Sequence, residues 1–219
     1  RQHMQPSLFV LNKYRNLFNL GTQGPDIFFY HNAWPWSKGV SLSGTGSRLH
    51  DEKVKDFFSH ALEAIYRAQG EKKSMLLSYI YGYVCHHSLD IHVHPYIYYK
   101  TGFAMDEHDD KKKYDAYHRK LEAEIDVLMA KRILNKKAHQ VPSHELIMIN
   151  QEEAEAMAEM YNYILKKIWD MDISEKEIQK AAKDMAEVTK ALRDPFGIKR
   201  ALIGFAEKVA SKHQLISNI

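Results

Sequence analysis

Four of the thirteen histidines fall within residues 86–94, and this segment constrains the fold more than any other part of the chain. In a helix, His86, Asp90 and His94 lie four residues apart and therefore share one face. Because a helix rises about 1.5 Å per residue, His86 and His94 are about 12 Å apart, too far for both to bind one small ion. We therefore expect a helix that offers ligands to two metal ions, with Asp90 placed to contact both.

A second segment repeats this pattern of imidazole and carboxylate groups. His118, Glu122 and Asp126 also lie four residues apart, so a helix would place them on one face. Neutral imidazole and carboxylate suit zinc and related metals, and facing helices can hold such a cluster in the core of a bundle. One His-x-x-x-Asp pair alone is a weak indication of a site. Two such segments together favour a metal-binding helical protein.

The composition is that of a globular protein with a sizeable core. The chain has 219 residues, of which 45% are apolar and 27% charged, and we expect a single all-helical domain over residues 1–219. The 31 basic and 28 acidic residues nearly balance, which gives no indication of a nucleic-acid partner. No apolar run reaches about 18 residues, so we expect no transmembrane segment.

The start of the chain and its single cysteine give information about the cellular compartment. No charged segment followed by an apolar one opens the sequence, so a secretion signal is not indicated. Residues 1–4, Arg-Gln-His-Met, are typical of an expression remnant, which leaves the native start open. Cys85 has no second cysteine with which to form an internal disulfide. These features predict a cytoplasmic protein.

Apolar residues at helical spacing predict helices along most of the chain, and no strand alternation is found. We interpret residues 32–49 and 96–110 as loops, with Pro95 ending the helix before the second loop or limiting its last turn. The helices expected are residues 7–20, about 54–69, about 71–95, 111 to about 135, 150–169, one opening at Ser174 and one starting at Pro195. Those from about 145 to 213 contain few ligand residues and are expected to form a scaffold.

The loop at residues 32–49 contains two tryptophans, Trp34 and Trp36, and can line a pocket or fold over one. Two interpretations stay open for these side chains: contact with lipid, or local packing. Asp26 lies before this loop, where it either caps a helix or belongs to a site. His50 lies after it, at the expected entrance of the next helix.

Taken in order, the motifs resemble those of the zinc-dependent phospholipase C family, including its bacterial members of unassigned function. The resemblance covers about residues 18–130, and the combination of motifs is specific although each alone is not. The motifs are Gly21-x-x-Gly24-Pro25-Asp26, His50, His86-x-x-x-Asp90-x-x-x-His94-Pro95 and His118-x-x-x-Glu122. The resemblance implies an all-α bundle of the phospholipase C and single-strand nuclease type.

The resemblance also implies a zinc cluster and an acid beside it. Asp26 would act as general base or orient the attacking water. Asp126 matches no ligand of the family, and we expect it as an outer partner that orients His118 or Glu122. Two zinc ions would be bound by two ligand sets: His50, His86 and Asp90 in one, and His94, His118 and Glu122 in the other.

A third zinc of the family is completed by the N-terminal amine and an early histidine, and the only upstream histidine here is His3. Three alternatives stay open. This chain lacks the third site, or two metals suffice, or His31 or His92 substitutes. We prefer His31, because it follows the Asp26 segment directly.

The activity that the resemblance implies is metal-dependent hydrolysis of a phosphodiester. Paired metals would lower the pKa of a bound water and neutralise charge on the phosphoryl oxygens, without a covalent enzyme intermediate. Phe28, Tyr30 and Tyr96 are candidates for a substrate pocket. Phospholipids, nucleic acids and small phosphodiesters all fit this chemistry, and the family favours a phospholipid-like ester with transient contact to a membrane surface.

Two other classes of protein remain as alternatives. One is a catalytically silent helical protein that keeps zinc for structure, or that binds a partner or membrane. Its structural zinc site would have four protein ligands and no open position for water. The other is a different helical metallohydrolase, suggested by the pair His50-Asp51. The Gly-Pro-Asp segment and His94-Pro95 argue against the second.

Overall fold

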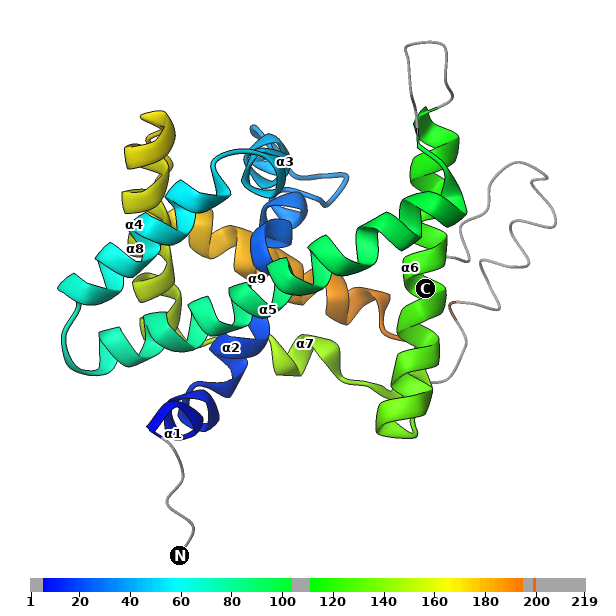
Figure 1. Cartoon of the computed structure of the whole chain (residues 1–219), viewed down its shortest axis with the longest axis horizontal. Helices are drawn as coiled ribbons and strands as arrows, with labels where there is room; N and C mark the ends of the chain where they lie inside the picture. Colours follow the sequence, from blue (N-terminus) through cyan, green and yellow to red (C-terminus); the bar gives the residue numbers. More distant parts are fainter. Residues whose placement is uncertain (1–5, 104–110, 195–198, 200–219) are drawn as a thin grey trace, which may run out of the picture. The chain divides into compact units, whose positions relative to one another are not determined.

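Every regular element of the protein is a helix within residues 6–103, 111–194 and 199, the residues that the computed structural model describes (Figure 1). The prediction of an all-α fold is therefore confirmed. In chain order the elements are α1 (Pro6–Lys13), α2 (Arg15–Gly21), η1 (Gly24–Tyr30), α3 (Ser43–Asp51), α4 (Val54–Arg67), α5 (Gly70–Thr101), α6 (Lys111–Leu134), η2 (Ala138–Gln140), α7 (Ser143–Leu146), α8 (Gln151–Trp169) and α9 (Glu175–Leu192).

The chain divides into two compact units, each described here by itself. The first unit comprises Arg1–Ser88 and Ser143–Thr189, and the second comprises Leu89–Pro142 and Lys190–Ile219. Helix α5 passes from the first unit into the second. The expectation of one domain over residues 1–219 stays a prediction.

The core of the first unit centres on two tyrosines. Tyr79 of α5 and Tyr161 of α8 are fully buried, and their hydroxyl oxygens lie 2.8 Å apart in a hydrogen bond. This bond satisfies two polar groups inside an apolar cluster, and burial raises the pKa of both phenols. Phe28 of η1 and Phe57 of α4 also contact the ring of Tyr161. The core thus fixes the elements that carry Asp26 and His86.

Helix α5 continues past Pro95 to Thr101, so the prediction that Pro95 ends the helix or limits its last turn is wrong, and Tyr96 lies on a helix rather than in a loop. An internal proline costs about 3 kcal/mol because it cannot donate to the carbonyl four residues earlier. Packing in the second unit offsets this cost. Ile97 is fully buried, and the Tyr98 ring packs against His94 and His118.

Helix α3 occupies the end of the segment that the sequence predicts to be a loop. Its first turn contains Gly44 and Gly46, which have low helix propensity. The helix forms nevertheless, because it packs against η1. The approach is so close that a Cβ placed on Gly46 would lie 3.3 Å from the Phe28 Cβ and from the Pro25 carbonyl oxygen. Helix α3 therefore packs closely on η1, and His50 lies in its last turn rather than at the entrance of α4.

Other boundaries agree closely with the sequence. The helices at residues 111–135 and 150–169 are confirmed, and the hydroxyl of Ser174 accepts from the Glu177 backbone N–H at the start of α9. The expected helix at residues 7–20 is instead two helices, which separate at Tyr14. Residues 1–4, the helix starting at Pro195, and the scaffold beyond residue 199 lie outside the described residues.

None of the helices in the described part of the chain is long and apolar enough to cross a membrane.

Candidate metal sites

The first unit brings together Asp26, His50 and His86, each partly buried, with one ligand atom from each within 4.8 Å of the others. The three side chains come from η1, α3 and α5. Two imidazole nitrogens and one carboxylate oxygen form a donor set that suits zinc. We call these three residues the first group.

Gly24 makes room for the imidazole of His86 in the first group. Its φ of +53° is a left-handed conformation that other residues rarely adopt, and a Cβ built there would lie only 2.2 Å from the His86 Cδ2 atom. The backbone of η1 can therefore lie directly against the ring. This explains why the chain has a glycine two residues before Asp26.

A backbone hydrogen bond orients His50 in the first group. The Nδ1 of His50 lies 2.9 Å from the carbonyl oxygen of Gly46, so Nδ1 carries the proton and donates it to that carbonyl. The other ring nitrogen, Nε2, faces Asp26 and lies 3.2 Å from its Oδ1 atom. Histidines that bind metals are commonly fixed in this way, with one nitrogen held by the protein and the other turned to the ion.

The second unit brings together His94, His118 and Glu122, again with one ligand atom from each within 4.8 Å of the others. The Oε1 atom of Glu122 lies 3.0 Å from His118 Nε2 and 3.5 Å from His94 Nε2. Glu122 thus faces one imidazole from its own helix α6 and one from α5. We call these residues the second group.

Asp90 orients His94 in the second group. Its Oδ1 atom lies 3.0 Å from the Nδ1 of His94, one helical turn away on α5. This contact fixes the ring with Nε2 turned to Glu122, and it supplies the carboxylate partner that often supports a metal-bound histidine. The sequence instead assigned Asp90 to the ligand set of His50 and His86. That assignment stays a prediction, because Asp90 belongs to the second unit.

Several ligand-atom separations in the two groups lie close to those of a zinc site. In a tetrahedral site with zinc–nitrogen and zinc–oxygen distances of about 2.0–2.1 Å, neighbouring ligand atoms lie about 3.3 Å apart. One ligand-atom pair in the first group is 3.2 Å apart and two pairs in the second are 3.0 and 3.5 Å apart, while the remaining pairs lie within 4.8 Å. With at most three protein ligands in each group, a position for water would also stay open, as in catalytic zinc sites.

Asp126 and His31, predicted as outer partner or additional metal ligand, belong to neither group. Asp126 is on α6, one turn after Glu122, and partial burial together with the negative charge of Glu122 raises the pKa of its carboxyl group. His31 is buried, and its Nε2 contacts the carboxylate of Glu177 on α9. The structure therefore does not bring His31 into the first group. No described contact joins Asp126 to His118.

The three aromatic residues predicted for the substrate pocket have different surroundings. Phe28 is fully buried against Tyr161, so it belongs to the core rather than to a pocket. Tyr30 is partly buried, and burial followed by the negative charge of Asp26 raises the pKa of its phenol. Tyr96 is half-exposed on α5 in the second unit, with the Lys100 ammonium 5.7 Å from its ring centre.

Two aromatic residues that the sequence reasoning did not single out contact the groups directly. The Phe29 ring stacks on His50 at 5.8 Å and is 41% exposed, so its outer face is open beside the first group. The Tyr98 ring lies 5.6 Å from His94 and 5.1 Å from His118. Helical spacing could have indicated Tyr98, since it follows His94 by four residues.

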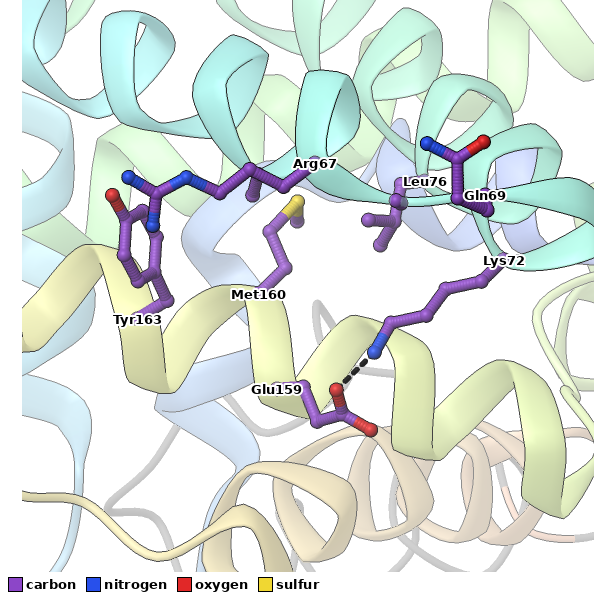
Figure 2. Close-up of a pocket in the computed structure, with 9 residues that line it drawn as sticks. Arg67, Gln69, Lys72, Leu76, Glu159, Met160 and Tyr163 are labelled. Atoms are coloured by element: carbon purple, nitrogen blue, oxygen red, sulfur yellow. Dashed lines mark hydrogen bonds and ion pairs between the residues drawn. The ribbon is translucent and has the colours of Figure 1, made fainter.

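The first unit also has a pocket of about 440 Å³ that contains no predicted site residue. Figure 2 shows Lys72 reaching across it to form an ion pair with Glu159, while Leu76 and Met160 supply an apolar wall. The Arg67 guanidinium lies 5.2 Å from the ring centre of Tyr163. Because its charged groups already have partners, this pocket offers no donor set comparable to the two groups.

Comparison with protein families matches residues 2–186 to the family described as zinc dependent phospholipase C. This match covers both groups and most of the described helices. Neither a curated protein nor a solved structure matches the chain.

Proposed function

The chain belongs to the zinc-dependent phospholipase C family, and on this premise we propose that it hydrolyses a phosphodiester of a phospholipid-like substrate. The observation that carries the proposal is the convergence of a carboxylate and two imidazoles in each of two groups, with the ligand atoms within 4.8 Å of one another. We propose one zinc ion for each group. His50, His86 and Asp26 would hold or flank the first, and His94, His118 and Glu122 would hold the second.

Zinc bound in such a site supplies two things: it lowers the pKa of a coordinated water towards neutrality and offsets negative charge on the phosphoryl oxygens. The residues of the chain supply orientation and proton transfer. Gly46 holds the proton on the Nδ1 of His50, which keeps its Nε2 directed at the reaction centre. Asp90 does the same for His94 in the second group.

We assign the role of general base to Asp26. Its side chain is 39% exposed, so water can reach the carboxylate, and its Oδ1 already lies beside His50 Nε2. A carboxylate in this position can accept the proton of the attacking water as the oxygen–phosphorus bond forms. The ester bond between phosphorus and the leaving oxygen then breaks, and that oxygen takes up a proton from Asp26 or from solvent, so that an alcohol departs without a covalent enzyme intermediate. The exposed face of Phe29, stacked on His50, can contact the apolar part of the substrate.

The test is hydrolysis by the zinc-loaded full chain of a short-chain, water-soluble phosphatidylcholine and of a chromogenic phosphodiester. We expect activity that a chelator removes and added zinc restores. Asp26→Asn should lower kcat by about 10²-fold or more while zinc content stays close to that of the wild type, because Asp26 is assigned to the attacking water more than to the ion. Activity of the zinc-loaded chain on neither substrate would contradict the proposal and favour a catalytically silent zinc protein.

A further inference from the structure

Residues 31–42, which we call the Trp loop, present two large apolar side chains to solvent. Trp36 is 72% exposed and Val40 is 85% exposed. The Trp loop connects η1, which carries Asp26, to α3, which carries His50, and all three lie in the first unit. Exposure of a tryptophan to this degree leaves a large apolar area in water, and large apolar exposed features commonly mark interaction sites.

Internal bonds hold the Trp loop in a defined conformation. The side-chain amide of Asn32 donates to the Val40 carbonyl oxygen at 3.2 Å and so joins the two ends of the loop. The backbone N–H of Asn32 donates to the Asp184 carboxylate of α9 at 2.9 Å. Within the loop, the Ser37 N–H donates to the Trp34 carbonyl oxygen at 2.9 Å, which closes a turn around Pro35.

The two tryptophans stack on each other, and this decides between the two interpretations of the sequence. Their rings are nearly parallel, with centroids 5.0 Å apart and planes 12° apart. Trp34 is partly buried and serves as the support, whereas Trp36 rests on it with most of its surface in water. Local packing therefore accounts for Trp34 but not for Trp36.

The surroundings of Trp36 fit a lipid surface. Trp side chains favour the boundary between lipid headgroups and acyl chains, because the ring is apolar while its N–H donates a hydrogen bond. The segment from His31 to Ser43 contains no acidic residue, and its one lysine, Lys38, is exposed close to Trp36 in the sequence. An ammonium group in this position can contact headgroup phosphates.

Trp36 and Val40 alone expose too little apolar area for the core of a stable protein interface. Two side chains of this size bury at most a few hundred Å² together, whereas specific protein interfaces bury about 1,200–2,000 Å² in total. Partial insertion into a lipid surface needs no such area, since each buried side chain contributes by itself. A lipid surface is therefore the occupant that the Trp loop fits best.

We propose that the Trp loop is an interfacial anchor that inserts Trp36 and Val40 into the headgroup boundary of a phospholipid bilayer. Lys38 adds attraction to headgroup phosphates. The anchor binds the surface whether or not the bound lipid is hydrolysed, so it does not depend on the proposed function. Its place in the chain, between the segments that supply Asp26 and His50, would bring the first group to the surface on which its substrate lies.

The test is flotation of the zinc-loaded full chain with phosphatidylcholine vesicles, with and without an anionic lipid. Trp36→Ala should weaken binding by about tenfold or more, the loss expected for one large apolar side chain. Val40→Ser should weaken vesicle binding less than Trp36→Ala does. Lys38→Glu should weaken binding mainly to vesicles that contain the anionic lipid. Tyr66→Ala is the matched control, because Tyr66 is an exposed aromatic side chain of α4 in the same unit and should leave binding unchanged.

Two further measurements separate the anchor from catalysis and from other partners. Asp26→Asn should bind vesicles like the wild type, and Trp36→Ala should keep activity on a monomeric soluble phosphodiester. Wild-type binding by Trp36→Ala, or equal weakening by Tyr66→Ala, would overturn the proposal. A dimer in sedimentation that Trp36→Ala dissociates would also overturn it, by showing that a second copy of the chain covers the loop.

Discussion

The two candidate metal groups offer similar donor atoms, yet they are built in different ways. The first group collects Asp26, His50 and His86 from three elements that are separated in the chain and packed on the apolar core of the first unit. The second group collects His94, His118 and Glu122 from two helices, through contacts at helical spacing and one contact between α5 and α6. Packing of three elements against the core fixes the first geometry, whereas helical spacing together with the packing of α6 on α5 fixes the second.

This difference predicts how each group responds to amino-acid substitutions. In the first group, a change in the supporting backbone should disturb both the metal site and the fold, because the same packing serves both. In the second group, removing a ligand should empty the site and leave most helices intact. The substitutions that follow test this contrast, from the largest expected effect to the smallest.

Gly24→Ala should have the largest effect. The left-handed φ of Gly24 costs an alanine about 1–3 kcal/mol, and the added Cβ would collide with the His86 ring. We expect a lower free energy of unfolding in urea and loss of the zinc of the first group. Gly44→Ala is the control: a Cβ at Gly44 meets nothing within 4 Å, so its stability should be unchanged or slightly raised. If Gly24→Ala had wild-type stability and zinc content, this would contradict the claim that the same packing supports the first group and the fold.

Glu122→Gln should remove the zinc of the second group and keep the fold. Its Oε1 atom faces both imidazoles of that group, and a neutral amide is a poor zinc ligand. We expect affinity at this site to fall by more than about 100-fold, since even outer partners contribute 10- to 100-fold. Circular dichroism should show little loss of helix. Global unfolding of this variant would instead indicate that zinc in the second group is structural.

Asp90→Asn should weaken zinc binding in the second group by about 10- to 100-fold, because Asp90 orients His94 through Nδ1. Asp126→Asn is the matched comparison one turn beyond Glu122 on α6, and it should have a smaller effect. Competition with a chromogenic chelator measures both affinities. An Asp90→Asn variant that loses zinc from the first group instead would restore the ligand assignment made from the sequence.

Tyr98→Ala should have a smaller effect, through the positions of His94 and His118 rather than through chemistry. The tyrosine ring packs on both imidazoles, so its removal should lower zinc affinity in the second group severalfold. Tyr98→Phe keeps the ring and should restore the affinity. Equal losses in the two variants would assign the effect to the hydroxyl and not to the ring.

The contrast between the groups also explains what the sequence could predict. Helical spacing predicts that Glu122 faces His118 and that α5 and α6 carry the ligands, because residues four apart on a helix are neighbours whatever the rest of the chain does. The proximity of Asp26 to His50 depends on how η1 packs on α3. Only the resemblance to a family indicated it.

Three departures from the sequence-based expectations have the same physical origin. Helix α3 forms in a Gly- and Ser-rich segment because Gly46 packs on η1. Helix α5 passes Pro95 because Ile97 is buried beyond it. The sequence Ile-Phe-Phe-Tyr does not reveal which ring faces outward, and the structure buries Phe28 and exposes Phe29. In the first two cases tertiary packing overrides a local preference, and in the third it determines what the local sequence leaves open.

The most direct test of the central claim is a zinc count, by elemental analysis of the full chain after zinc reconstitution and dialysis. The account predicts two zinc ions per chain for the wild type, one for each group. His50→Ala and Glu122→Gln should each retain one, and the double variant none. Less than one zinc per chain in the wild type, or loss of both ions in Glu122→Gln, would contradict two independently built zinc sites.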